Sequence, residues 1–330
     1  MAERVLVTGA GGFIGSHVVE RLIQEGYHVR AFVRYVSNGS IGNLVWLPPD
    51  MATELELVRG DVRDPDAVRQ ACRGCSLVLH LAASISIPYS YVHPREIVET
   101  NVLGTLNVLG ALAEAETVER VVVTSTSEVF GTAQYVPMDE VHPLQPQSPY
   151  AASKVAADKL AESFYRSYGL PVVVLRPFNT YGPRQTPRAI VPTIILQALQ
   201  HGQIRLGRLE PRRDLLYVAD TAAAFLACLR APQEAVVGQT FNVGTGCDVS
   251  IGELCRRICI LLDMPTLPVH IEERRFRPEE SEVYHLCADS RKAHQLLAWQ
   301  PRYNLDQGLQ ETIAWFARHR DRFAPEDYLV

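Results

Sequence analysis

Short apolar runs alternate with amphipathic stretches through the first half of the chain. The apolar runs have the length of single buried strands and cover residues 4–8, 28–33, 55–58, 77–81, 121–124 and 172–175. Between them, apolar residues recur at helical spacing in residues 13–25, 66–72, 95–114 and 149–168. Strands separated by helices pair in parallel through right-handed crossovers. The pattern therefore predicts an α/β fold with a doubly wound parallel sheet, covered by helices on both faces.

The pattern changes after Pro177. Gly, Pro and Arg become frequent, and the helical stretches that remain are short, at residues 191–201, 251–262 and 309–319. These elements are too few for a second doubly wound sheet. We expect residues 1–177, with about 215–245, to form the sheet domain. We expect about 178–214 and 246–330 to form a smaller mixed lobe over the C-terminal edge of the sheet.

Composition and charge exclude several classes of protein. The 330 residues include 32 Lys and Arg against 37 Asp and Glu, and no basic block occurs, so neither nucleic acid nor an anionic membrane is an expected partner. No signal peptide and no apolar run long enough to span a membrane is present, which favours a cytoplasmic protein. Cys72 and Cys75 form a C-x-x-C pair that could bind zinc or act in redox chemistry, but no second close pair with zinc-finger spacing accompanies it. We therefore expect the seven cysteines to be free thiols and expect no metal site.

A glycine-rich turn joins the first strand to the first helix. Gly9, Gly12 and Gly15 have the spacing of a dinucleotide-binding loop, within the run Gly9, Ala10, Gly11, Gly12, Phe13, Ile14, Gly15. Glycine allows the sharp turn and the close approach of a pyrophosphate, and the helix N-terminus supplies hydrogen-bond donors. The order of strand, loop and helix predicts that the sheet domain is a Rossmann-type dinucleotide-binding domain.

Further cofactor contacts are expected where the other strands end. The second strand ends at Arg34 rather than at the acidic residue usual for NAD, and an arginine can accommodate a 2′-phosphate. NADP is therefore favoured over NAD. Asp61 and Val62, after the third strand, are expected beside the adenine. The small residues Leu81, Ala82 and Ala83, after the fourth strand, leave room for the cofactor backbone.

Tyr150 and Lys154 form a Y-x-x-x-K pair on the predicted helix 149–168. Residues four apart share one helix face, so Lys154 can lower the pKa of the phenol and hold the nicotinamide ribose. A phenolate can remove an alcohol proton while hydride leaves the carbon. The fifth strand ends immediately before Thr126, which can hold the same alcohol oxygen, and Glu128, which can place a carboxylate beside a sugar.

Taken together, these motifs resemble the extended short-chain dehydrogenase/reductases of the nucleotide-sugar epimerase/dehydratase family. The matching segments are T-G-A-G-G-F-I-G, D-V, L-A-A, Asn101, S-T-S-E-V-F-G, Y-A-A-S-K, R-P-F-N-T-Y-G-P and R-R-D-L-L-Y-V-A-D, in the family's order. The resemblance implies a tightly bound nicotinamide cofactor that is regenerated in each turnover. It also implies a nucleotide-diphosphate sugar bound by the second lobe, and a homodimer.

The resemblance also assigns individual residues. It implies that Asn101 and Thr124 contact the cofactor, and that the substrate is bound by Ser84, Thr126, Asn179, Arg213 and Arg277. Bidentate arginines suit the phosphates of such a substrate. Asp214 and Asp220 are expected to be structural, and His80 and His93 to be packing or surface residues.

Three reactions of this family share C4 oxidation by Tyr150. A 4,6-dehydratase then eliminates water across C5–C6 and returns hydride to C6, a decarboxylase loses carbon dioxide from a 4-keto uronic acid, and an epimerase returns hydride to the other face. An epimerase needs no carboxylate at the position of Glu128. Dehydratases usually have Thr-Asp-Glu where this chain has Thr126, Ser127 and Glu128, and serine is a far weaker acid for departing water.

Thr-Ser-Glu is also the pattern of UDP-glucuronate decarboxylases, which keeps that activity open. However, the run after Glu128 most resembles bacterial 4,6-dehydratases acting on nucleotide-linked N-acetylglucosamine, which supply surface polysaccharides. The 4,6-dehydratase is therefore the favoured activity, with a decarboxylase or 4-epimerase as the alternatives. A non-catalytic relative is remote, because Tyr150, Lys154 and Thr126 are all present.

The expected homodimer would form through the two long helices, residues 95–114 and 149–168. Their outward faces are predicted to include Leu106, Leu109, Val155 and Leu160.

Overall fold

The computed structural model describes residues 3–115 and 117–323. Seven parallel strands form one sheet in the order β10-β6-β5-β4-β1-β2-β3. Their bounds are β1 Arg4–Thr8, β2 His28–Arg34, β3 Leu55–Gly60, β4 Leu77–His80, β5 Arg120–Thr124, β6 Val172–Pro177 and β10 Thr240–Val243. This is the predicted doubly wound sheet. Six of its strands match the predicted runs, and β10 comes from the 215–245 segment.

Helices cover both faces of the sheet because side chains alternate along each strand. In β1, Val5 and Val7 pack toward α1 (Phe13–Gln24), α9 (Val218–Arg230) and α12 (Arg291–Leu297). Leu6 packs on the other face, toward α3 (Pro65–Cys72), α6 (Gly104–Ala113) and α7 (Pro149–Tyr168). Strands buried on both faces explain why their sequences are almost continuously apolar.

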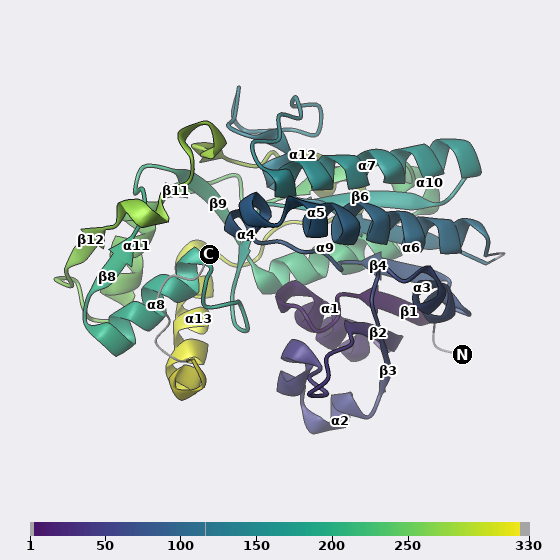
Figure 1. Ribbon diagram of the computed structural model, residues 1–330, viewed down its shortest axis with the longest axis horizontal. Helices are drawn as coiled ribbons and strands as arrows, with labels where there is room; N and C mark the ends of the chain where they lie inside the picture. The colour runs from purple at the N-terminus through teal and green to yellow at the C-terminus, as the bar shows by residue number, and fades with distance from the viewer. Residues whose placement is uncertain (1–2, 116, 324–330) are drawn as a thin grey trace.

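Six further strands and three helices form the lobe at the left of Figure 1, around a separate apolar core. Its strands are β7 Asn179–Tyr181, β8 Ile204–Leu206, β9 Arg212–Tyr217, β11 Asp248–Ser250, β12 Val269–Ile271 and β13 His285–Leu286. They form the sheet β11-β9-β13, with β7 beside β9, and a pair of β8 and β12. The helices are α8 Ile190–His201, α11 Ile251–Leu261 and α13 Leu305–His319. This is the expected small, mixed set of elements.

Short helices complete the chain. They are α2 Pro49–Ala52, α4 Ile87–Val92, α5 Pro94–Val98 and α10 Gln233–Val236, together with η1 Gly42–Trp46, η2 Glu99–Leu103, η3 Ser127–Phe130, η4 Glu273–Arg275, η5 Glu279–Ser281 and η6 Arg320–Arg322. The prediction for α13 began four residues too late, because Asn304 starts this helix with a capping box to Gln307.

The predicted helix 95–114 is present as α5, the π-helical segment η2 and α6 in direct succession. One part of its expected outward face is wrong: Leu109 is fully buried between α6 and the sheet. The π-helical turns shift the helical phase, which a constant 3.6-residue period does not anticipate. Leu106 is 38% exposed, while Val155 and Leu160 are half-buried against the protein's own core.

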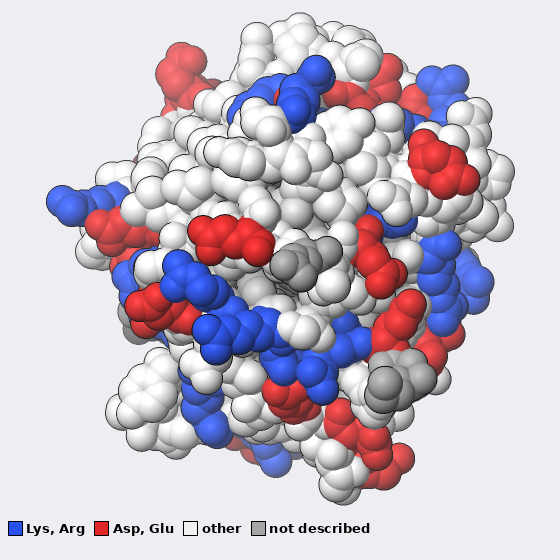
Figure 2. All heavy atoms as spheres, turned by 90° about the vertical axis from the view of Figure 1, so that its right-hand side faces the viewer, with Lys and Arg blue, Asp and Glu red and all other residues white. Residues whose placement is uncertain are grey.

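The seven cysteines are free thiols, and six of them are buried. Acidic side chains border the basic ones on the face shown in Figure 2. Many of the charges are paired locally, as in Arg21–Glu25 and Arg69–Asp66. Within the described residues, no helix is long and apolar enough to cross a membrane.

Candidate active site

The glycine-rich loop makes the sharp turn that its sequence predicts. Gly9 has a φ of +69°, and a Cβ there would lie 2.7 Å from the backbone nitrogen of Ala82. A Cβ on Gly15 would overlap the carbonyl oxygen of Gly9. The loop thus leads from β1 into the N-terminus of α1 through a turn that has no room for a side chain at Gly9 or Gly15. This is the form of a pyrophosphate cradle. Gly12 is the N-cap residue of α1, and Phe13 and Ile14 open the helix.

A second segment lies against this loop. The backbone nitrogen of Asn43 donates to the carbonyl of Gly11 at 2.8 Å, and its side chain donates to the carbonyl of Arg184 in the lobe at 3.0 Å. The segment follows the end of β2, where the Arg34 side chain is exposed. Asp61, beyond the neighbouring β3, pairs with Arg63 at 2.7 Å. The hydrogen bond from Arg63 is the main cause of a lowered pKa of Asp61, and the charge of Arg34 contributes less.

The expected residues after β4 are held by Asn101, which lies in the π-helical segment η2. The Asn101 amide donates to the carbonyl of Ser84 at 3.0 Å and to Ser153 Oγ at 2.9 Å, and its oxygen accepts from the Ser84 nitrogen at 2.7 Å. Asn101 is fully buried. It therefore joins the segment Leu81–Ser84 to α7.

Tyr150 and Lys154 lie on one face of α7, as their spacing predicts, and both side chains are buried. The Lys154 ammonium donates to the carbonyl of Thr124 at the end of β5, at 2.6 Å. Burial lowers the pKa of Lys154 to about 8, although Asp158 acts in the opposite direction. The hydroxyl of Thr124 is buried without a protein partner. Lys154 is therefore anchored to the end of β5, beside a buried hydroxyl that has no protein partner.

The predicted lowering of the Tyr150 pKa by Lys154 is not found within the protein alone. Burial raises the pKa of the phenol, Glu128 and Asp158 raise it further, and a hydrogen bond with Thr126 lowers it. The sequence argument considered only the helical spacing, whereas the phenol also loses solvent and faces two carboxylates. The hydrogen bond brings Thr126 and Tyr150 together, as expected for two groups that hold one alcohol oxygen.

Glu128 follows β5 in the short helix η3, which Thr126 caps by accepting a hydrogen bond from the Glu128 nitrogen at 3.3 Å. The Glu128 side chain is 8% exposed, and its Oε2 lies 3.9 Å from Arg277 Nη1. Ser127 is buried beside it. The structure therefore brings Thr126, Glu128 and Tyr150 into one site, with a carboxylate available for proton transfer.

The lobe contributes two arginines to the same site. Arg213 comes from β9 and is buried, and Arg277 lies between η4 and η5. Burial lowers the pKa of Arg213, and neighbouring Arg277 acts in the same direction. Nη1 of Arg277 and the side-chain oxygen of Asn179 are both buried without a hydrogen bond. Two adjacent guanidinium groups with an unused donor form a suitable site for phosphate oxygens.

Three polar residues in and behind this site were not predicted: Tyr91, Asp158 and Glu282. Glu282 Oε1 lies 3.7 Å from Arg213 Nη2 and 3.9 Å from Arg277 Nη1. The Tyr91 hydroxyl is 2.6 Å from Ser281 Oγ, which connects α4 to the segment that carries Glu282. For Asp158 the sequence does contain an indication, because a residue four positions after Lys154 lies on the same face of the helix.

Asp214 and Asp220, which we expected to be structural, accept hydrogen bonds from backbone nitrogens of other segments. Asp214 accepts hydrogen bonds from the backbone nitrogens of Thr245, Gly246 and Ala288. Asp220 accepts one from the Tyr303 nitrogen at 3.0 Å. His80 is buried between the hydroxyls of Thr8 and Thr105, and His93 is exposed. Among the described residues, no group of three or more His, Cys, Asp and Glu side chains could hold a metal ion.

The fold and the site define a class of protein: an extended short-chain dehydrogenase/reductase of the nucleotide-sugar dehydratase and epimerase type. The family model described as GDP-mannose 4,6 dehydratase matches residues 6–312. The chain belongs to this family, whose members include NAD-dependent nucleotide-sugar dehydratases and epimerases.

Relatives with both kinds of activity resemble the whole chain. A putative UDP-glucose 4-epimerase of Methanocaldococcus jannaschii is 34% identical over 94% of this chain and 97% of its own length. The mouse dTDP-D-glucose 4,6-dehydratase is 32% identical over 96% of this chain and 90% of its own. The dTDP-glucose 4,6-dehydratase of Streptomyces venezuelae, solved with NAD bound, superposes with a TM-score of 0.88 at 30% identity, covering 98% of this chain and 99% of its own.

Proposed function

We propose that the protein is an NAD(P)-dependent nucleotide-sugar 4,6-dehydratase and that its substrate carries an amino sugar. The observation that carries the reaction type is the buried carboxylate of Glu128, which shares a site with Tyr150, Thr126 and the arginine pair. A 4-epimerization needs no proton transfer at C5, whereas elimination of water across C5–C6 does. The amino-sugar substrate rests on the similarity of the segment after Glu128 to dehydratases of nucleotide-linked N-acetylglucosamine.

The side chains act in order along the sugar. Tyr150 takes the proton of the C4 hydroxyl, which Thr126 holds by a hydrogen bond. A bound nicotinamide would accept the hydride from C4 and return it to C6. Lys154 would hold the nicotinamide ribose, with its charge close to the phenol. Glu128 then removes the C5 proton, which is acidic beside the new carbonyl.

Departure of the C6 hydroxyl requires a proton. Ser127 occupies the position at which an Asp usually provides it, and a serine hydroxyl is too weak an acid for this step. Glu128 is protonated once it has taken the C5 proton and can pass that proton to the departing hydroxyl. One carboxylate then acts first as base and afterwards as acid over the elimination. When hydride returns to C6, C5 takes up a proton, and the proton that Tyr150 removed from the C4 hydroxyl balances this uptake.

The substrate diphosphate is proposed to bind to Arg213 and Arg277, with Asn179 on the same phosphates and Ser84 at the sugar. Arg277 Nη1 faces both Glu128 and Glu282 at 3.9 Å and has no hydrogen bond, so it is free to bind a phosphate oxygen. Residues about 178–214 and 246–330 would form this nucleotide-sugar lobe, and residues 1–177 with about 215–245 the cofactor domain.

For the cofactor we propose NADP, tightly bound and regenerated in each turnover. The support is Arg34 at the end of β2, where its exposed guanidinium can pair with a 2′-phosphate. The adenine would lie beside Asp61 and Val62. The protein is further proposed to be a cytoplasmic homodimer, and the exposed Leu103 and Leu106 of the η2–α6 region provide apolar surface for the contact.

Incubation of the purified protein with UDP-, GDP-, dTDP- and CDP-linked sugars tests the proposal, with mass spectrometry of the products. Loss of one water from an N-acetylhexosamine nucleotide is the expected result. Loss of carbon dioxide from a uronic acid would replace the proposal with a decarboxylase. A new isomer of unchanged mass would establish a 4-epimerase, the second candidate, which the similarity to the Methanocaldococcus jannaschii protein favours.

A further inference from the structure

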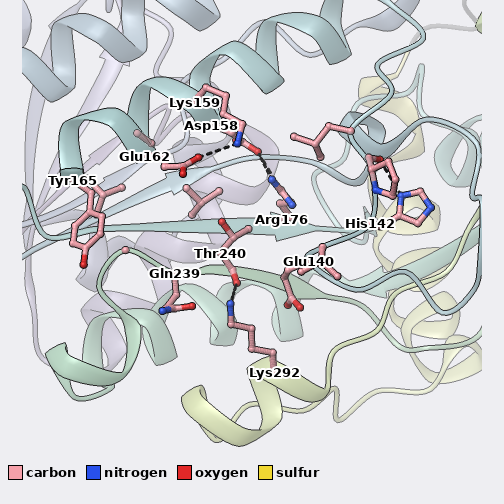
Figure 3. Close-up of a pocket in the computed structure, with 17 residues that line it drawn as sticks. Glu140, His142, Asp158, Lys159, Glu162, Tyr165, Arg176, Gln239, Thr240 and Lys292 are labelled. Carbon is pink, nitrogen blue, oxygen red and sulfur yellow. Dashed lines mark hydrogen bonds and ion pairs between the residues drawn. The ribbon is translucent and has the colours of Figure 1, made fainter. Parts of the chain in front are cut away.

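A buried ion pair lies next to the Tyr150–Lys154 pair, on the same helix. Asp158 is four residues after Lys154 on α7, and its side chain is 4% exposed. Its Oδ2 accepts hydrogen bonds from Arg176 Nε at 3.1 Å and Nη2 at 3.0 Å. Figure 3 shows this contact between α7 and β6, at the wall of a cavity of about 470 Å³. The pair therefore connects the helix of the catalytic residues to the sheet.

The same carboxylate oxygen is linked to the strand end that holds Lys154. Ser125 Oγ donates to Asp158 Oδ2 at 2.8 Å, and Ser125 follows Thr124, whose carbonyl accepts the Lys154 ammonium at 2.6 Å. Two consecutive residues at the end of β5 thus bind Lys154 and Asp158. The carboxylate and the ammonium are therefore both attached to the same strand end.

We propose that Asp158 is a positioning residue for catalysis: held by Arg176 and Ser125, its carboxylate keeps the buried Lys154 ammonium charged and in place. The inference rests on the proposed role of Lys154 in holding the cofactor and supporting the Tyr150 phenolate. Arg176 stabilises the ionised form of Asp158, because a buried carboxylate needs a hydrogen-bonded countercharge to offset its desolvation.

The electrostatics of the site support this role. Burial lowers the pKa of Lys154 to about 8, and Asp158 is the charge that raises it. Asp158 also raises the pKa of Tyr150, as does Glu128. Asp158 on α7 and His80 on β4 interact electrostatically with Lys154. Tyr150 on the same helix faces Glu128 on η3 as well as Asp158, and Asp158 is paired with Arg176 on β6. Loss of the Asp158 charge therefore moves the titrations of both Lys154 and Tyr150 to lower pH.

The test is the pH dependence of acetylation of Lys154 by acetic anhydride, measured by mass spectrometry on the full-length protein. In Asp158→Asn we expect the midpoint of the acetylation profile to move to lower pH by on the order of one unit, as for removal of one opposite charge. The alkaline limb of turnover should move with it. Ser125→Ala removes one of the two groups that hold the carboxylate without changing the charge, so it should shift the midpoint less than Asp158→Asn does.

Glu140 provides a matched charge control, because it lines the same cavity but accepts its hydrogen bond from the Asn242 nitrogen, at 2.8 Å. Glu140→Gln should leave the Lys154 midpoint unchanged. Asp158→Asn leaves Arg176 buried without its countercharge, so Asp158→Asn/Arg176→Gln serves as a second variant if the first does not fold. The double variant should also move the midpoint of Lys154 acetylation to lower pH, since Asp158 is the charge that acts on Lys154.

An unchanged Lys154 midpoint in whichever of these Asp158 variants folds would overturn the inference. So would an equal shift in Glu140→Gln, because the effect would then be general to the cavity. The proposed function fails separately: if no nucleotide sugar is converted by the unaltered protein, the labelling midpoints still decide whether Asp158 controls the charge of Lys154.

Discussion

Glu128 Oε2 and Arg277 Nη1 lie 3.9 Å apart, although the two residues come from different parts of the chain. Glu128 follows β5 of the parallel sheet, and Arg277 belongs to the lobe. Their contact places the proposed C5 base beside a proposed phosphate ligand. A sugar whose diphosphate is held by Arg277 is thereby kept within reach of both Glu128 and Tyr150.

Replacement of this base separates oxidation from elimination. In Glu128→Gln we expect formation of the 4-keto-6-deoxy product to fall by about 10²–10⁴-fold, the usual contribution of a general acid–base group. Slow reduction of the cofactor by substrate should continue, because Tyr150 is intact. Nicotinamide absorbance follows the first step, and mass spectrometry follows the product. A variant that forms the dehydrated product at the unaltered rate would show that Glu128 is not the base.

Tyr150→Phe removes the hydroxyl and keeps the ring that is buried on α7. Turnover should fall by about 10²–10⁴-fold, since the phenol that takes the C4 proton is lost. Cofactor affinity should be retained, because Lys154 and the glycine-rich loop are unchanged. Turnover assays and a direct binding titration measure the two effects. Near-normal turnover would exclude Tyr150 as the catalytic base.

The structure also shows which features local sequence could predict. Helix α7 has the predicted bounds, and the glycine-rich loop has the predicted form, because caps, periodicity and turn chemistry are properties of neighbouring residues. Tyr91 was missed because its partner Ser281 lies 190 residues further along the chain, in the lobe. Glu282 was missed because its contact with Arg213 depends on how the lobe folds. The raised pKa of Tyr150 was missed for a related reason, since burial depends on the whole fold.

Arg34 is expected to determine the choice between the two nicotinamide cofactors. Arg34→Ala should weaken NADP binding by roughly tenfold or more, the value of a charge-assisted hydrogen bond, and leave NAD binding nearly unchanged. Titration of the cofactor-free protein with each dinucleotide measures this. Arg59, which is exposed on the neighbouring strand β3, provides a matched control as Arg59→Ala. Tighter binding of NAD than NADP by the unaltered protein would contradict the proposal.

His80 makes stability depend on acidity. Burial lowers its pKa to about 3, and the ring is held between the hydroxyls of Thr8 and Thr105. Below the ordinary value of about 6.5 the unfolded chain takes up a proton that the folded protein excludes, so stability falls as pH decreases. Urea unfolding from pH 6 to 4 should show a loss of about 1.4 kcal/mol per pH unit that His80→Asn lacks. Equal slopes in the two proteins would mean that His80 is protonated when folded.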